Sequence, residues 1–208
     1  MRTLVALFAL ACASPSSAGS PDDNRPAPLP PAGPGQAVAV FAGGCFWCME
    51  TDFDGLTGVV ATTSGFAGGH TKNPTYMDVT SESTGHQEAV RVVYDTSKLS
   101  YSDLVSYYFH HVDPTDDGGQ FCDRGDSYRP VIFAADATQH AAAEAVKTEV
   151  QISGVLGAPV VVPIVDGATF YAAELYHQDF HEKNPSRYLP YRLGCGRDAR
   201  VKALWHTK

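Results

Sequence analysis

The sequence predicts an α+β domain with a small mixed sheet flanked by helices, because segments typical of strands are few and lie between segments typical of helices. A length of 208 residues and a hydrophobic content of 44% suffice for one compact domain with a sizeable core. The formal net charge is -8 and the chain has no run of Lys or Arg, which argues against nucleic acid as a partner.

The beginning of the chain is typical of an exported protein. Arg2 gives a positive start, and residues 4–11 form an apolar stretch too short to span a membrane permanently. Small residues before Ala18 predict cleavage after it, so residues 1–18 are interpreted as a signal peptide and the protein as exported, in the periplasm. Lipid attachment at Cys12 is an alternative whose sequence pattern matches less well.

Residues 19–36 are rich in proline and are predicted to be a linker that acts as a tether, since such a segment cannot pack a core. The folded domain is therefore predicted to span residues 37–208. No segment of this domain is long and apolar enough to cross a bilayer, and nothing in the sequence demands more than a monomer.

The elements of the domain follow from apolar patterns and capping residues. The predicted strands cover residues 37–42, 59–66, 87–94, 131–134 and 160–165. The predicted helices cover residues 46–53, 100–112, 136–151 and 172–182. Ser100 and Asp136 are each followed three residues later by a second capping-box residue, which places two helix starts. From Asn184 onward the tail is predicted to be irregular, with an exposed loop at 194–196.

The candidate nucleophile is Cys45, which follows two glycines at the end of an apolar strand and precedes a helix. Unpaired N–H groups and the positive end of the helix dipole favour an anion at such a position. This placement lowers a cysteine pKa from about 8.5 into the range of roughly 3.5 to 7.5, so the sequence predicts a thiolate. Gly43 and Gly44 are expected to leave room for substrate near the backbone. The alternative is an inert structural cysteine.

Glu88 is the candidate general acid. Alternation along residues 87–94 places it on the same face as Val90 and Val92, and apolar surroundings raise the pKa of a carboxyl. A raised pKa suits proton donation near neutral pH. The alternative is a carboxylate at a strand end that turns toward water or pairs with an arginine.

Two polar loops carry tyrosines outside regular structure. Residues 118–130 are broken by glycines and include Tyr128, and residues 73–76 end in Tyr76. Loops of this composition either solvate a surface or carry site residues on a rigid scaffold. Buried tyrosines usually find a hydrogen-bond partner, although ordinary partly buried aromatics fit the same pattern.

Five short motifs follow one another along the domain. They are Gly-Cys-Phe-Trp at 44–47, Asn-Pro-Thr-Tyr at 73–76, Gly-His-Gln-Glu at 85–88, Asp-x-Gly-x-x-Tyr-Arg at 123–129 and Ala-Glu-x-Tyr-His-Gln-Asp-Phe at 173–180. In this order they resemble the type A peptide methionine sulfoxide reductase family. The resemblance implies a two-layer α+β sandwich and reduction of the S epimer of methionine sulfoxide, free or in proteins. It implies no metal and no bound organic cofactor.

The resemblance also implies catalytic roles. Cys45 attacks the sulfoxide sulfur while Glu88 protonates the sulfoxide oxygen. Tyr76 and Tyr128 donate further hydrogen bonds to that oxygen. Methionine then leaves, and Cys45 remains as a sulfenic acid, which is a reversible oxidation state.

Three further matched residues have supporting roles by the same resemblance. Phe46 and Trp47 form the apolar wall that accepts the S-methyl group of the substrate. Asp123 acts through water or by ordering the tyrosines.

The sulfenic acid is expected to condense with a second thiol, giving a disulfide that an external, thioredoxin-like dithiol reduces. Cys195 is ranked first as this resolving thiol, because a loop flanked by glycines can swing toward the site. Cys48 is ranked second, since a C-x-x-C pair at a helix start can close into a disulfide, and Cys122 third. Simple packing around the site is the alternative for Cys48 and Cys122.

Other functions fit parts of the sequence. His177 and His181 have the spacing of a zinc pair on a helix, but the glutamate of H-E-x-x-H is absent, so His177 is predicted to make structural hydrogen bonds. A thioredoxin-like disulfide oxidoreductase using Cys45 and Cys48 is the alternative enzyme. A periplasmic module that binds a metal or a peptide without catalysis is the alternative outside enzymes.

Overall fold

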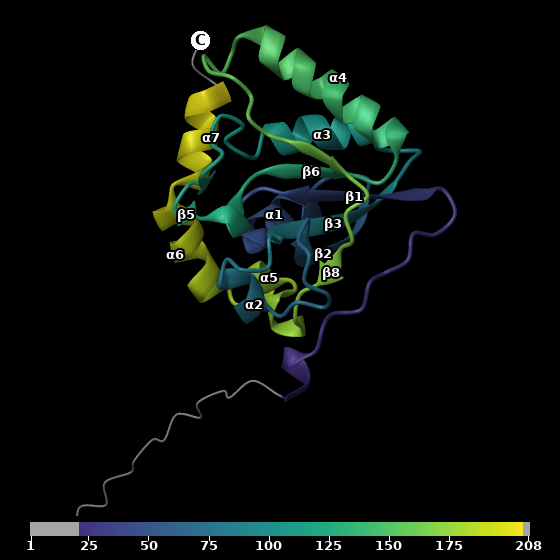
Figure 1. The fold of residues 1–208 in the computed structure, drawn as a ribbon, viewed down its shortest axis with the longest axis vertical. Coiled ribbons are helices and arrows are strands. Elements are labelled where there is room, and N and C mark those ends of the chain that lie inside the picture. The colour runs from purple at the N-terminus through teal and green to yellow at the C-terminus, as the bar shows by residue number, and fades with distance from the viewer. Residues whose placement is uncertain (1–20, 206–208) are drawn as a thin grey trace, which may run out of the picture.

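The computed structural model describes residues 21–205, which form a mixed sheet with helices packed against it (Figure 1). The strands lie in the order β7-β6-β1-β3-β2-β8, in which β6 and β7 pair in parallel and the other neighbours pair antiparallel. Their bounds are β1 Gln36–Ala42, β2 Val59–Ala67, β3 Gln87–Asp95, β6 Val131–Ala134, β7 Ile164–Asp166 and β8 Tyr171–Ala172. A separate hairpin consists of β4 Gly119–Gln120 and β5 Asp123–Arg124.

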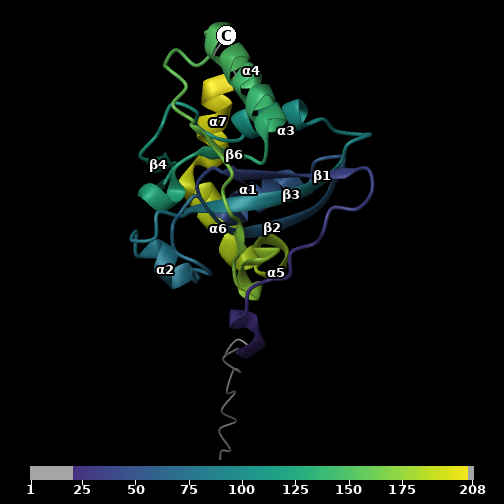
Figure 2. The same cartoon turned by 45° about the vertical axis from the view of Figure 1, so that its right-hand side comes forward.

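The helices differ widely in length. Their bounds are α1 Phe46–Asp54, α2 Tyr76–Thr80, α3 Tyr101–Phe109, α4 Ala137–Ser153, α5 Phe180–Lys183, α6 Pro185–Cys195 and α7 Arg197–Trp205. Short 3-10 helices cover η1 Pro21–Asn24, η2 Asp126–Tyr128 and η3 Leu175–His177. Both views show α3 and α4 stacked beside the strands and the yellow helices α6 and α7 along one side of the sheet (Figures 1 and 2).

The main core lies on one face of the sheet. Phe41 and Val92 of the sheet are fully buried there and belong to one cluster with Phe53 of α1 and Leu104 of α3. The opposite face carries a smaller cluster that includes Phe133. Helices on one face of a small mixed sheet make a two-layer α+β fold, so the predicted fold class is confirmed.

The strand register brings distant segments to one end of the sheet. The end of β1 pairs with the start of β3 and with the start of β6. Cys45 follows β1, Glu88 is the second residue of β3, and Tyr128 closely precedes β6. The end of β2, which also pairs with the start of β3, leads toward Tyr76. Four segments that are far apart in sequence therefore meet at this end.

Most predicted elements are confirmed, including both capped helices. The Ser100 side chain accepts from the N–H of Asp103 and completes a capping box, and Asp136 accepts from the N–H groups of Thr138 and Gln139. The strand predicted over residues 160–165 is shorter, because proline lacks an N–H and pairing with β6 begins only after Pro163.

The helix predicted over residues 172–182 is wrong. Tyr171–Ala172 pairs with β2, and the Gln178 side chain exchanges hydrogen bonds of 2.9 and 3.0 Å with the backbone of Ser64. Asp179 then takes a left-handed conformation with φ 53°, which a regular helix does not tolerate. In place of a continuous helix, this segment pairs with the edge of β2 through Tyr171–Ala172 and then bonds the β2 backbone through the Gln178 side chain.

The prediction of an irregular tail is also wrong, because residues 185–195 and 197–205 are helical. Arg192 of α6 and Arg197 of α7 both bind the buried Asp52 of α1, at 2.7 and 3.3 Å. Gly196 separates the helices in a left-handed conformation with φ 74°. Charge pairing with a distant helix, which local sequence does not reveal, orders the tail.

The proline-rich segment lies against the domain within its described part, so the prediction of a free tether is corrected there. Ala27 N donates to Ala173 O at 2.9 Å, and Leu175 N donates to Arg25 O at 3.0 Å. Hydrogen bonding at a sheet edge holds this segment although it buries little apolar surface. The predicted cleavage site at Ala18 and the lipidation site at Cys12 lie outside the described residues. Over residues 21–205, no helix combines the length and apolar character needed to cross a membrane.

Candidate active site

A pocket at the shared end of the strands collects the predicted site residues. It is lined by Cys45, Phe46, Trp47, Tyr76, Glu88, Asp123, Tyr128 and Tyr191. The structure therefore brings together all seven residues that the sequence assigned to nucleophile, acid, donors, apolar wall and supporting carboxylate. It adds Tyr191, which sequence reasoning missed.

The turn before the nucleophile is tightly packed. Gly44 has φ 82°, and a Cβ there would lie 2.7 Å from Cβ of Gln120. A Cβ on Gly43 would lie 2.6 Å from Val112 and 2.7 Å from Met49. The protein's own side chains occupy this space, so the expectation that the glycines make room for substrate is wrong. Their absence of side chains instead allows the turn that presents Cys45.

Cys45 is the N-cap residue of α1 and is buried, with 6% of its surface exposed. Burial raises its pKa well above the ordinary value, and hydrogen bonding with Cys48 and the Glu88 carboxylate raise it further. The predicted resting thiolate is therefore wrong, because desolvation outweighs the helix dipole. Cys45 rests as a thiol and must lose its proton during the reaction.

Cys48 lies one turn along α1, buried beside Phe180 and Tyr188. Hydrogen bonding with Cys45 lowers its pKa, burial opposes this, and the charges of Arg197 and Arg192 lower it further. The two free thiols thus form one buried, hydrogen-bonded pair.

Glu88 is 2% exposed, and its Oε2 accepts a 2.9 Å hydrogen bond from the N–H of Phe46. Burial raises its pKa to about 8, even though this hydrogen bond favours the charged form. The predicted direction is correct, since Glu88 shares the apolar face of β3 with Val90 and Val92. At neutral pH its carboxyl holds a proton that it can donate.

The two predicted tyrosines line the same pocket as this carboxyl. Tyr76 begins α2, which Thr75 and Asp78 cap, and its N–H donates to Glu174 Oε1 at 3.0 Å. Tyr128 ends η2. Burial raises the pKa of Tyr76 to about 12 and raises that of Tyr128 as well. Both hydroxyls therefore remain donors.

The apolar wall is anchored from the C-terminal half of the chain. Trp47 stacks on Phe180 with ring centroids 3.7 Å apart, and its Nε1 donates to His177 Nδ1 at 3.1 Å. Phe46 is buried in the core. The hydrogen bond between Trp47 and His177 is the structural role predicted for His177. Burial lowers the His177 pKa to about 3, so the ring is neutral.

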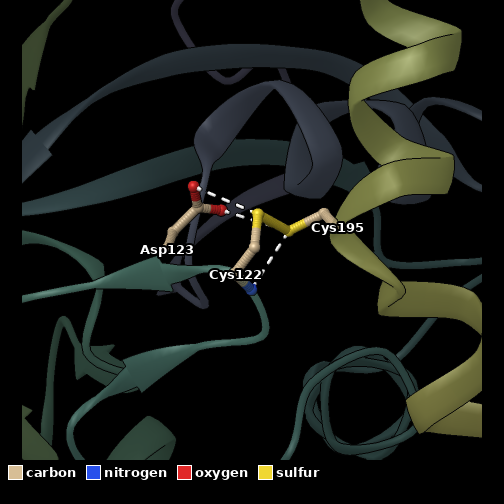
Figure 3. Close-up of side chains that lie close together, drawn as sticks. All are labelled: Cys122, Asp123 and Cys195. Atoms are coloured by element: carbon tan, nitrogen blue, oxygen red, sulfur yellow. Dashed lines mark hydrogen bonds between the residues drawn. A yellow bond between two sulfur atoms is a disulfide. The ribbon is translucent and has the colours of Figure 1, made fainter.

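Cys195 and Cys122 form a disulfide at the rim of the pocket (Figure 3). This pairing was not predicted, because the ranking considered each cysteine only as a partner of Cys45. The sulfurs of Cys122 and Cys195 lie 3.7 and 3.8 Å from the carboxylate oxygens of Asp123. Cys122 is exposed at the tip of the β4–β5 hairpin, so this disulfide reaches solvent while Asp123 faces the pocket.

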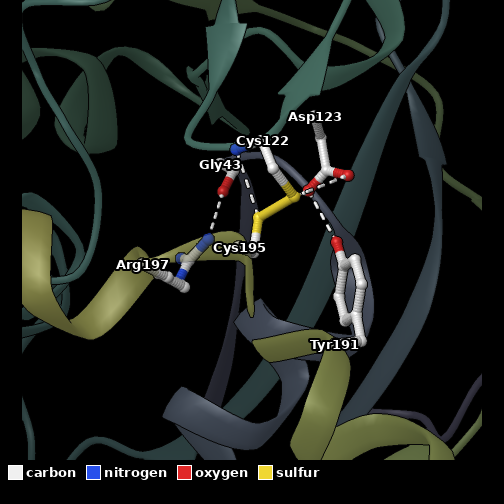
Figure 4. Close-up of a disulfide and its surroundings, with 6 residues drawn as sticks. All are labelled: Gly43, Cys122, Asp123, Tyr191, Cys195 and Arg197. Carbon is white, nitrogen blue, oxygen red and sulfur yellow. Dashed lines mark hydrogen bonds between the residues drawn. A yellow bond between two sulfur atoms is a disulfide. The ribbon is translucent and has the colours of Figure 1, made fainter. Parts of the chain in front are cut away.

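Tyr191 connects the rim with the nucleophile. Its hydroxyl donates to Asp123 Oδ2 at 2.6 Å (Figure 4). Its ring meets the ring of Trp47, which lies beside Cys45 in the chain, edge-on with centroids 6.0 Å apart. The tyrosine that Asp123 orders directly is thus Tyr191. The missed signal is the four-residue spacing between Tyr191 and Cys195, which is informative only if the tail is helical.

Comparison with known proteins identifies the family. The sequence model described as peptide methionine sulfoxide reductase matches residues 37–208. Peptide methionine sulfoxide reductase MsrA 2 of Caulobacter vibrioides is 51% identical over 205 residues, covering 99% of each chain. The chain belongs to the peptide methionine sulfoxide reductase family.

Solved structures of the family have the same fold. Methionine sulfoxide reductase A of Corynebacterium diphtheriae matches with a TM-score of 0.70 at 32% identity, over 74% of this chain and 77% of that one. Mxr1 of Saccharomyces cerevisiae in its reduced form matches with a TM-score of 0.69 at 26% identity, over 74% and 90%. The chain is an oxidoreductase that reduces methionine sulfoxide with thiols, as the motifs predicted.

Proposed function

We propose that Cys45 attacks the sulfur of methionine S-sulfoxide while Glu88 protonates the sulfoxide oxygen. The observation that carries this proposal is the position of a buried, protonated carboxyl in the same pocket as a buried thiol. A sulfoxide sulfur is weakly electrophilic until its oxygen is protonated or strongly hydrogen-bonded. The S–S bond formed by this attack then breaks as the protonated oxygen passes from the substrate sulfur to the Cys45 sulfur. Methionine leaves with both electrons of that S–S bond, and Cys45 becomes a sulfenic acid.

The pocket walls explain the orientation of the substrate. Tyr76 and Tyr128 remain protonated and are placed to bind the oxygen together with Glu88. Phe46 and Trp47 supply the apolar surface for the S-methyl group. Separate polar and apolar walls fix the positions of the oxygen and the methyl group, so one sulfur epimer is selected.

Cys48 is the resolving thiol that we now favour over Cys195. It hydrogen-bonds Cys45 within the same helix, whereas Cys195 is bonded to Cys122. Cys48 attacks the Cys45 sulfenic sulfur, a Cys45–Cys48 disulfide forms, and the oxygen leaves as water.

An external, thioredoxin-like dithiol restores the enzyme in this proposal. Yeast Mxr1 is known in complex with Trx2, which supports a protein dithiol as reductant. The dithiol reduces the exposed Cys122–Cys195 disulfide beside the pocket and is itself oxidised. The freed Cys122 and Cys195 thiols then reduce the Cys45–Cys48 disulfide by exchange, which returns the buried pair to thiols and re-forms Cys122–Cys195.

We also propose export to the periplasm after cleavage near Ala18. The leader pattern of residues 1–18 supports it, and a Cys122–Cys195 disulfide fits an oxidising compartment. N-terminal sequencing of protein from the native host tests it, and an intact Met1 on cytoplasmic protein would contradict it.

The catalytic proposal is tested with the two separate epimers of free methionine sulfoxide and dithiothreitol as reductant. The S epimer is expected to give methionine and the R epimer none, because the R epimer exchanges the positions of oxygen and methyl. Cys45→Ser protein is the negative control. Equal turnover of both epimers would contradict the assigned pocket walls.

A further inference from the structure

The proton of Cys45 needs an acceptor in the pocket. Cys45 rests as a thiol, because burial raises its pKa. Among the residues lining the pocket, carboxyls belong only to Glu88 and Asp123. Glu88 is already protonated at neutral pH and is occupied as the acid. Asp123 is therefore the remaining carboxylate.

Tyr191 lies between Cys45 and that carboxylate. Its hydroxyl donates to Asp123 Oδ2 at 2.6 Å (Figure 4). The same hydroxyl is a hydrogen-bonding partner of Cys45, which lines the same pocket. A tyrosine hydroxyl has one proton to donate and two lone pairs that accept, so it can accept from the thiol while it donates to the carboxylate. A proton can therefore pass from Cys45 through the Tyr191 hydroxyl to Asp123.

We propose that Tyr191 is a further catalytic residue, which passes the proton of the Cys45 thiol to Asp123 as Cys45 attacks the sulfoxide. This inference rests on the proposed function of the pocket. The S–H bond of Cys45 breaks and a new O–H bond forms on Tyr191, while the former Tyr191 proton moves to Asp123 Oδ2. The hydroxyl then donates back to the developing thiolate and stabilises it.

The protons balance over the step. Glu88 gives one proton to the sulfoxide oxygen, and that proton stays in the Cys45 sulfenic acid. Asp123 holds the proton that left Cys45, and exchange with water returns it to Glu88. The partly exposed position of Asp123 beside exposed Cys122 allows this exchange. No oxidant or reductant beyond substrate and Cys45 is needed.

The titration of the participating groups agrees with this path. Burial raises the pKa of Tyr191, so it remains protonated and acts as a carrier rather than as a base. Burial also raises the pKa of Asp123, against the opposing effects of Tyr191 and Arg197, which favours its holding a proton. The titratable groups around Cys45 are Cys48 of α1, Tyr76 of α2, Glu88 of β3, Asp123 of β5, Tyr128 of η2 and Tyr191 of α6.

The tail holds the carrier in place. Cys195 lies one helical turn beyond Tyr191 on α6, and its disulfide joins this helix to the hairpin that carries Asp123. Arg192, the next residue, binds Asp52 of α1 at 2.7 Å. Both connections fix the ring between α1 and the hairpin, so the hydroxyl alone can be removed without moving the helix.

Tyr191→Phe in the full chain, with the disulfide confirmed by mapping, is the test. Single-turnover methionine formation is expected to fall about 10²-fold, the lower end of general acid–base effects. Alkylation of Cys45, followed site by site against pH, is expected to need higher pH than in wild type. Tyr107→Phe, which removes a hydroxyl bonded at 2.7 Å to the Asp52 carbonyl, is the matched control and is expected to leave both unchanged.

Asp123→Asn is expected to cause a similar loss, and the double variant is expected to lose no more than either single variant. Unchanged rate and alkylation in Tyr191→Phe would overturn the inference and leave Cys48 as the acceptor. Additive losses in the double variant would overturn it as well. Failure of the proposed function is distinguishable, because wild-type protein itself would then form no methionine in a single turnover.

Discussion

Two pairs of cysteines in one small region of this reductase differ in nearly every physical respect. Cys45 and Cys48 are free, buried and carried by the first turn of a single helix. Cys122 and Cys195 are 73 residues apart, lie at the pocket rim and are joined in a disulfide. Asp123 and Tyr191 lie between the two pairs.

The difference separates two requirements of the reaction. Activation of a sulfoxide needs a dry pocket in which one proton donor stays protonated, and burial of Glu88 provides it. Exchange with a protein dithiol needs sulfur that a second protein can reach, and Cys122 provides that. One sulfur cannot be both fully buried and fully accessible. The buried pair therefore serves the reaction with the sulfoxide, and the exposed pair serves exchange with a protein dithiol.

The largest expected effect is the loss of the buried nucleophile. Cys45→Ser is expected to abolish methionine formation, because no other thiol faces Glu88 in the pocket. Cys122→Ser, which alters only the exposed pair, is expected to retain about one methionine per enzyme in a single turnover. Chromatographic measurement of methionine checks both, and residual product from Cys45→Ser would place the nucleophile elsewhere.

Removal of the acid is expected to be the next largest effect. Glu88→Gln is expected to slow methionine formation by about 10² to 10⁴-fold, since an amide binds the oxygen but cannot protonate it. In wild type the rate should fall as pH rises through about 8, where Glu88 loses its proton. The variant should lack this fall. Near wild-type rates between pH 6 and 9 would show that Glu88 is not the acid.

The two second thiols are expected to have smaller and distinguishable effects. Cys48→Ser should form one methionine and then stall as the Cys45 sulfenic acid, because the adjacent resolving thiol is absent. The Cys195→Ser variant should turn over at the wild-type steady-state rate with dithiothreitol. Its rate should fall only when a protein dithiol is the reductant. Steady-state rates with each reductant check this, and the opposite pattern would restore Cys195 as the resolving thiol.

The smallest expected effect concerns stability of the buried helix. Glu50 of α1 is fully buried, and desolvation raises its pKa from 4.5 to about 8. The folded state favours the protonated form of Glu50. The contribution of Glu50 to the free energy of unfolding is therefore fully present below pH 4.5 and is lost as the pH rises to about 8. Each pKa unit corresponds to about 1.4 kcal/mol.

Glu50→Gln keeps an acceptor for the N–H of Asp179 without this titration. Urea unfolding at pH 5, 7 and 9 is expected to show a smaller loss of stability with pH in the variant, by a few kcal/mol at most. An identical pH dependence in both proteins would mean that Glu50 remains charged in the fold.

Much of the buried region was predictable from sequence. Alternation on β3 placed Glu88 in the core, and the glycine turn placed Cys45 at a helix start. These features are local or periodic, so a single segment reveals them. The thiolate expected at Cys45 was not correct, because the outcome depends on how fully other elements bury the sulfur.

The rim could not be predicted in the same way. The Cys122–Cys195 disulfide and the Tyr191–Asp123 hydrogen bond join segments about 70 residues apart, which is why neither leaves a local pattern. The tail helices depend on Asp52, whose partners Arg192 and Arg197 lie about twice as far away in sequence. Long-range charge pairing, not propensity, decides the structure of the tail.

Disulfide mapping after one turnover tests most directly whether catalysis is confined to the buried pair. Protein with free Cys45 and Cys48 and an intact Cys122–Cys195 disulfide would receive one equivalent of methionine sulfoxide, followed by alkylation, digestion and mass spectrometry. The expected product is one methionine and a Cys45–Cys48 disulfide, with Cys122–Cys195 unchanged. A Cys45–Cys195 disulfide, or methionine formed while Cys45 remains a free thiol, would contradict this account.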